Sequence, residues 1–114
     1  MNTYNPDSWV LIKFYSEGYP EGVPKVFAGW YGGYLGSDSW KLSSGVESVV
    51  DKGDYYEFKN CSGSIYNCHK QSQQMSGYMS DIFSGWKAEE AKSEGKIRID
   101  VETNIVTGVT YIEP

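Results

Sequence analysis

Residues 29–40 have the sequence Gly-Trp-Tyr-Gly-Gly-Tyr-Leu-Gly-Ser-Asp-Ser-Trp, and the rest of the chain is organised around this stretch. It places two tryptophans and two tyrosines among four glycines, so large flat side chains alternate with bare backbone. Glycine loses more conformational freedom on folding than any other residue, so this density indicates backbone with φ > 0 or a close backbone approach. The stretch predicts either a turn through an aromatic core or a surface that presents rings to a partner.

Short β-branched and aromatic runs lie on both sides of this stretch. Residues 8–15 are apolar or aromatic at most positions, which is typical of a strand, and tight turns such as residues 51–54 separate the later runs. The predicted strands are residues 8–15, 25–31, 40–43, 46–50, 55–59 and 65–69. Because their connections are short, they predict an antiparallel β-meander of about six short strands.

The spacing of apolar residues changes after residue 70. The residues that recur at intervals of three and four are Met75, Tyr78, Met79, Ile82, Phe83 and Trp86. This spacing places them on one face of an α-helix. Ser72 is a suitable N-cap and Gly95 stands where a glycine commonly ends a helix, so we expect an amphipathic helix over about residues 73–94.

The C-terminal part returns to strand patterns. Residues 97–102 alternate apolar and charged side chains, the pattern of a strand with one solvated face. Residues 105–112 predict a closing strand, so the two form a predicted C-terminal β-hairpin. Because an amphipathic helix must bury its apolar side, we expect it to pack on a sheet face. The sequence therefore predicts one α+β domain that spans residues 1–114.

The charge balance is acidic and evenly spread. The chain has 15 acidic and 10 basic residues, a formal charge of −5, with no basic run and no acidic tail. A protein that binds nucleic acid directly needs a patch of Lys and Arg to neutralise phosphates, so we do not expect that class of partner. An acidic surface favours a partner with a basic one.

The chain shows no feature of secretion or of membrane insertion. Its first residues have neither a basic segment nor an apolar segment of the kind found in signal peptides, and no apolar run approaches 18 residues. We therefore expect a cytoplasmic protein with no membrane contact, in which Cys61 and Cys68 are free thiols.

Catalytic and metal-binding motifs are weak. Cys68 and His69 are adjacent, so on a strand their side chains point to opposite faces, although Cys61 could approach His69 across a hairpin. A structural zinc site needs four ligands at tight spacings, and this set is incomplete. The glycines of residues 29–40 lack the Lys and Ser or Thr of a phosphate-binding loop. We expect no metal, no cofactor and no enzymatic activity, and keep a Cys/His thiol enzyme as an alternative.

The aromatic stretch and a later serine turn are the candidate binding surface. Their residues are Trp30, Tyr31, Tyr34, Trp40, Ser62 and Ser64. Rigid amphipathic rings interleaved with Gly and Ser are typical of recognition surfaces, but the two tryptophans also suit a core. The rings would bind a protein partner or, alternatively, stack on a small ligand such as a nucleotide or glycan.

Three blocks of sequence resemble a group of small phage and prophage proteins of unassigned function. The blocks are GWYGGY at 29–34, GSDSWKLSSG at 36–45 and SGSIYNCHK at 62–70. The resemblance implies a phage accessory protein that acts in the host cytoplasm. Together with the acidic balance, the aromatic and glycine-rich stretch and the lack of catalytic motifs, it leads us to expect a non-enzymatic protein that binds a host protein and inhibits a defence system or serves host takeover. The resemblance implies no reaction. Oligomeric state is left open, and exposed strand edges would allow a dimer by edge pairing.

Overall fold

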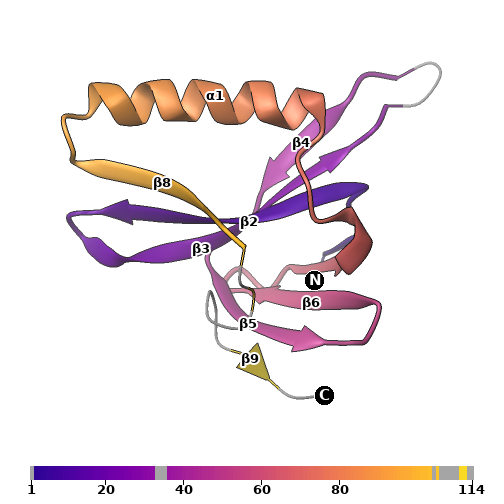
Figure 1. Cartoon of the computed structure of the whole chain (residues 1–114). Helices are drawn as coiled ribbons and strands as arrows, with labels where there is room; N and C mark the ends of the chain where they lie inside the picture. The colour runs from indigo at the N-terminus through magenta and orange to yellow at the C-terminus, as the bar shows by residue number, and fades with distance from the viewer. Residues whose placement is uncertain (1, 33–35, 104, 106–110, 113–114) are drawn as a thin grey trace.

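The computed structural model of the chain describes residues 2–32, 36–103, 105 and 111–112 and has three layers (Figure 1). Helix α1 forms one outer layer, a four-stranded sheet lies in the middle, and a five-stranded sheet forms the other outer layer. The elements are β1 (Thr3–Tyr4), β2 (Ser8–Ser16), β3 (Tyr19–Trp30), β4 (Ser39–Leu42), β5 (Val46–Asp51), β6 (Tyr55–Asn60), β7 (Ile65–His69), the short 3-10 helix η1 (Lys70–Ser72), α1 (Gly77–Lys92), β8 (Ile97–Glu102) and β9 (Tyr111–Ile112).

The predicted α+β class is confirmed, and the predicted meander is divided between the two sheets. The middle sheet has the strand order β4-β3-β2-β8, and the outer sheet has the order β1-β7-β6-β5-β9. Strands β2, β3 and β4 are antiparallel neighbours in one sheet, and β5, β6 and β7 are antiparallel neighbours in the other. The division buries both faces of the middle sheet, which a single open meander cannot do.

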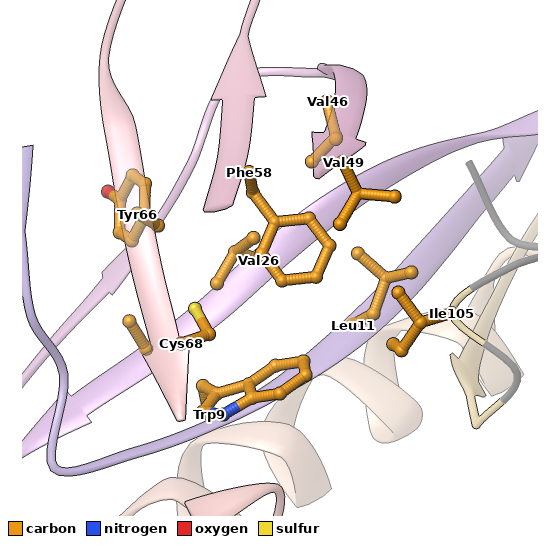
Figure 2. Packing of buried hydrophobic residues seen from close by; sticks show 10 residues of the cluster. Trp9, Leu11, Val26, Val46, Val49, Phe58, Tyr66, Cys68 and Ile105 are labelled. Atoms are coloured by element: carbon orange, nitrogen blue, oxygen red, sulfur yellow. The ribbon is translucent and has the colours of Figure 1, made fainter. Parts of the chain in front are cut away.

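The first five residues of strand β2, residues 8–12, are buried on both faces of the sheet, which explains the continuous apolar run of residues 9–12. Trp9 and Leu11 face the five-stranded sheet, where they pack with residues such as Phe58 (Figure 2). Val10 and Ile12 belong to the second buried cluster, which includes residues of α1. Successive side chains of a strand point to opposite faces, so a central strand between two layers needs apolar residues at every position.

Helix α1 begins later than predicted. Its N-cap is Ser76, whose hydroxyl accepts a hydrogen bond from the backbone N–H of Met79 at 3.2 Å, whereas Ser72 ends the short helix η1. The predicted apolar face is the buried one: Met79 is fully buried, and Trp86 is one of the half-buried residues packed beside it. Gly95 has a φ of 87°, as expected of a glycine just beyond a helix end.

The two strands predicted as a C-terminal hairpin lie in different sheets. Strand β8 pairs antiparallel with β2, and β9 pairs in parallel with β5. The predicted closing strand over residues 105–112 falls largely outside the described residues, which include the two residues of β9. Strand β1 was not predicted, and it pairs in parallel with β7. These pairings join segments far apart in the chain, so no local pattern indicates them.

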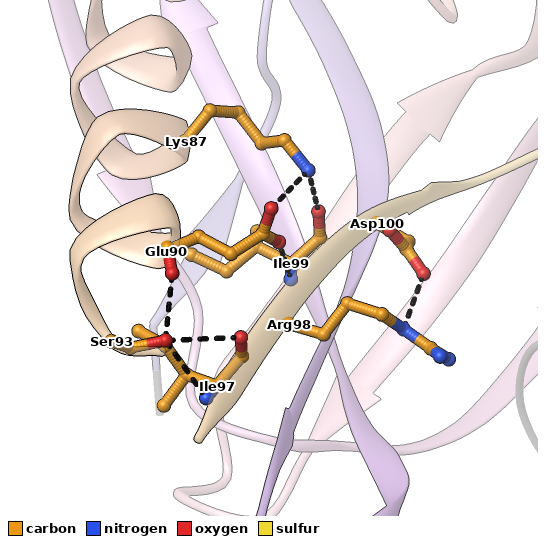
Figure 3. A network of polar contacts seen from close by, with 7 residues as sticks. All are labelled: Lys87, Glu90, Ser93, Ile97, Arg98, Ile99 and Asp100. Atoms are coloured by element: carbon orange, nitrogen blue, oxygen red, sulfur yellow. Dashed lines mark hydrogen bonds and ion pairs between the residues drawn. The ribbon is translucent and has the colours of Figure 1, made fainter. Parts of the chain in front are cut away.

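The outer edge of β8 is capped by side chains of α1 (Figure 3). The Glu90 carboxylate accepts a hydrogen bond from the Ile99 N–H, and the Lys87 ammonium donates to the Ile99 carbonyl at 3.1 Å. The Ser93 hydroxyl accepts from the Ile97 N–H at 3.2 Å. The hydrogen bond from Lys87 is the main cause that lowers the pKa of Glu90, which favours the charged acceptor. Because side chains of α1 bind these backbone groups, they are not available to pair with a strand of a second copy.

At three glycines of the 29–40 stretch, another part of the chain comes so close that a side chain would not fit. A Cβ on Gly29 would lie 2.5 Å from the Met79 sulfur, so the absent side chain lets α1 approach β3. A Cβ on Gly32 or on Gly36 would lie less than 2.5 Å from backbone atoms across the loop. The sequence left two reasons for these glycines, a positive φ or a close approach of another part of the chain. Close approach is the reason at these three positions.

We expect Gly29→Ala and Gly85→Ala to change stability in opposite directions. At residue 29 the new methyl group displaces buried Met79, which costs about 1–3 kcal/mol of unfolding free energy. At Gly85, inside α1, a Cβ meets nothing within 4 Å, so alanine stabilises by about 1 kcal/mol. Urea denaturation of both variants is the measurement. Equal effects would contradict the close contact at Gly29.

Candidate functional site

The structure places Trp30 and Trp40 on opposite faces of the middle sheet. In the register of β3 and β4, Trp30 pairs with Ser39 and Gly29 pairs with Trp40. Because adjacent residues alternate between faces, Trp30 lies toward the five-stranded sheet and Trp40 lies toward α1. Trp30 and Trp40 therefore do not belong to one binding surface, and Tyr34 lies outside the described residues.

Both tryptophans are half-buried and packed into the fold. The Trp30 indole N–H donates to the Asn5 carbonyl at 3.0 Å, and its ring meets Tyr4 edge-on with centroids 6.2 Å apart. Trp40 lies edge-on to Phe27 at 5.9 Å and to Trp86 at 5.5 Å. Their packing and hydrogen bonding account for both indoles as parts of the structure.

Tyr31 is exposed and held in place. Its side chain is 56% exposed, its hydroxyl lies 3.1 Å from the Ser8 hydroxyl, and its backbone N–H donates to the Asp7 carboxylate at 2.8 Å. The next residue, Gly32, donates its N–H to the Asp38 carboxylate at 3.0 Å. Asp7 and Asp38 are themselves exposed. We call Tyr31, Asp7 and Asp38 the Tyr31 patch: an exposed tyrosine and two exposed carboxylates that bind its backbone N–H and that of the next residue.

The serines of the β6–β7 turn form a hydroxyl cluster. The Ser44 hydroxyl donates to Ser62 at 2.8 Å, the Ser62 and Ser64 hydroxyls lie 3.1 Å apart, and the Asn60 amide donates to Ser64 at 3.0 Å. Gly63 has a φ of 91°, as a tight turn requires. These bonds tie the turn to the end of β4, which is a structural reason for both serines.

A cavity of about 420 Å³ lies beside this turn. Its walls include Ser62, Ser64, Tyr4 and Tyr66. Burial is the main cause that raises the pKa of Tyr66 to about 12, so its phenol stays neutral at physiological pH. The centroid of the Tyr4 ring lies 4.9 Å from that of Tyr66 and 6.2 Å from that of Trp30. Tyr4 thus links the predicted aromatic residue to the predicted serine turn.

Cysteine and histidine side chains are kept apart. Cys68 is fully buried, and burial raises the pKa of its thiol. His69 is exposed, with its ring 5.6 Å from Tyr55. Cys61 is exposed at the turn end of the β6–β7 hairpin, whereas His69 pairs with Tyr55 at the opposite end. This geometry does not bring a thiol and the imidazole within hydrogen-bond distance.

Sequence reasoning missed Tyr4, Asp7 and Asp38. Tyr4 reaches Trp30 and Tyr66 because β1 pairs in parallel with β7, a long-range contact with no local pattern. Asp7 is brought to Tyr31 by the pairing of β2 with β3. Asp38 had a local signal, because a carboxylate between small residues often accepts a backbone N–H in a turn.

Neither a metal centre nor a membrane span is found in the part of the chain that the structure describes. No group of three or more His, Cys, Asp or Glu side chains there is placed to hold a metal ion. No helix among the same residues is both long enough and apolar enough to cross a bilayer. No protein-family model matches the chain, and no curated protein or solved structure matches it at a significant level.

Proposed function

We propose that this chain is a non-enzymatic binding protein whose contact surface is centred on the Tyr31 patch. The observation that carries the proposal is an exposed tyrosine whose backbone and hydroxyl are both hydrogen-bonded. A ring that is held in one orientation before binding loses little entropy when a partner covers it. Tyrosines of this kind commonly provide the strongest single contacts of protein interfaces.

The chemistry of the patch supports a basic partner. Asp7 and Asp38 bind the backbone N–H groups of Tyr31 and Gly32, so two exposed carboxylates lie close to the exposed Tyr31 side chain along the chain. A Lys or Arg side chain can pair with such carboxylates while its charge lies against the ring. The formal charge of −5 adds long-range attraction to a positively charged protein surface.

We include in this proposal that the protein acts in the cytoplasm of a phage host. The resemblance of residues 29–45 and 62–70 to small phage and prophage proteins supports an accessory role in the host cytoplasm, in which the partner is a host protein. Blocking a defence system or redirecting a host process needs tight binding and no chemistry. Gene neighbourhood tests this setting: we expect the gene to lie among other anti-defence or host-takeover genes.

Replacing the exposed ring tests the contact surface. Tyr31→Ala is expected to weaken binding of a partner purified from host lysate by about 30-fold, the loss typical of an interface hot spot. Asp38→Asn keeps an acceptor for the Gly32 N–H but removes one charge, so we expect a loss of a few fold that disappears at high salt. Isothermal titration calorimetry measures both.

Tyr19 is the matched control. It is also an exposed tyrosine, 63% exposed at the start of β3, far along the strand from Tyr31. Tyr19→Ala should leave binding unchanged. A partner that responds equally to both variants, or purified protein that turns over a substrate, would overturn the proposal.

A further inference from the structure

A second surface, away from the Tyr31 patch, has the features of a small-molecule site. It is an open groove of about 630 Å³ between the β2–β3 hairpin, the start of β8 and the two turns that follow β4 and β6. Its volume lies within the range of ligand pockets, about 300–1,000 Å³. Its apolar walls include Phe14, Val23, Ile97 and Ile99. A groove of this size and composition favours a ligand with an apolar body.

Two cations and no carboxylates line the groove in the described part of the chain. The Arg98 guanidinium lies 4.0 Å from the centre of the Tyr15 ring and is paired with Asp100 at 2.8 Å. The Lys25 ammonium lies 5.7 Å from the centre of the Phe14 ring, and no ion pair to it is found among the described residues. Lys25 is therefore a half-buried charge beside apolar surface, with no carboxylate partner among the residues that the structure describes.

The wall formed by β8 is held rigid by α1. Ser93 fixes the Ile97 backbone, and Lys87 and Glu90 fix that of Ile99 (Figure 3). Arg98 is oriented on the same strand by Asp100. Because this wall and Arg98 are already ordered, a ligand that binds there loses less free energy to their ordering.

We propose that this groove binds a small amphipathic anion, a medium-chain carboxylate, with its apolar body against Phe14, Val23 and Ile97 and its carboxylate on Lys25. Arg98 provides a second positive charge at the same groove. The apolar walls supply affinity through buried surface, and the Lys25 ammonium selects an anionic head over a neutral one. The site is independent of the proposed protein interface at Tyr31.

The reactivity of the Cys61 thiol can be used to measure whether a ligand occupies the groove. It is an exposed thiol that lines the groove, whereas Cys68 is fully buried with a raised pKa and reacts slowly. The rate at which iodoacetamide, a neutral reagent, modifies Cys61 therefore reports access to the groove. Mass spectrometry of the peptide that contains Cys61 measures that rate.

We expect sodium decanoate, kept below its micellar concentration, to slow modification of Cys61 in a saturable manner, with calorimetry giving the same affinity. Lys25→Gln should weaken decanoate about tenfold, which is the equivalent of about 1.4 kcal/mol. The same variant should bind 1-decanol, the neutral analogue, as the unchanged protein does. The matched control is Lys52→Gln, which replaces an exposed lysine outside the groove. It should change neither the affinity for decanoate nor the affinity for 1-decanol.

Three results would overturn the proposal. The first is folded protein in which decanoate protects Cys61 no better than 1-decanol does. The second is equal decanoate binding by Lys25→Gln and Lys52→Gln, with both variants shown to be folded by circular dichroism. The third is protection of Cys61 that rises with protein concentration alone, which would mean that a second copy covers the groove. Tyr31→Ala should leave decanoate protection intact, so either proposal can fail without the other.

Discussion

Replacing Trp9 with alanine is expected to lower the free energy of unfolding by about 3–5 kcal/mol, the largest effect of a single substitution that we expect in this protein. Trp9 is 0% exposed between the two sheets, and its ring centroid lies 5.4 Å from Phe58 and 6.1 Å from Tyr56. Truncation leaves a large void among side chains that belong to both sheets, which can close only in part. Urea denaturation followed by circular dichroism measures the loss.

Trp9→Phe separates packing from hydrogen bonding at the same position. The indole N–H of Trp9 donates to the His69 carbonyl at 2.7 Å. Phenylalanine retains most of the ring contacts but leaves that carbonyl without its donor, so we expect a loss of about 1–3 kcal/mol. If Trp9→Ala cost no more than Trp9→Phe, the ring would not be the contact that joins the two sheets.

Replacing Trp86 with alanine is expected to cost about 3 kcal/mol and to loosen α1 from the middle sheet. The Trp86 ring lies at the centre of an aromatic cluster, with centroid distances of 4.7 Å to Phe27, 5.5 Å to Trp40 and 6.0 Å to Phe14. Because Trp86 is half-buried, the expected cost lies at the low end of the range for buried tryptophans. Hydrogen exchange of the α1 amides should accelerate more than that of β5–β7 amides.

Tyr78 on the same helix is the control for this prediction. It was predicted to lie on the apolar face but is 37% exposed. Tyr78→Ala should cost about 1 kcal/mol or less and leave hydrogen exchange of the helix nearly unchanged. Equal slowing or acceleration in both variants would show that helix propensity, and not the Trp86 cluster, holds this layer.

The proposed binding residues can be replaced without a large loss of stability. Tyr31 and Cys61 are exposed, so their replacement should change the unfolding free energy far less than that of Trp9. A loss of binding by Tyr31→Ala with normal stability would therefore report on the interface. The predictions on stability and those on binding therefore concern different residues.

Local patterns predicted the elements of this chain well. Residues 65–69 and 97–102 were predicted as strands with the bounds that the structure has. The recurrence of Met79, Ile82 and Trp86 at helical spacing identified both the helix and its buried face. The start of the helix was misplaced because Ser72 and Ser76 are equally good caps by residue type, and only the short helix η1 distinguishes them.

The sequence by itself determined the α+β class, the helix with its apolar face, and most of the strands, because the side-chain periods of helices and strands are local properties. Only the tertiary structure decided that two sheets lie face to face, that β8 and β9 join different sheets, and that Trp30 and Trp40 lie on opposite faces. It also decided that Asp7 meets Tyr31 and that Lys25 faces an apolar groove. These contacts join residues distant in sequence, and their energy depends on burial and pairing that no local pattern records.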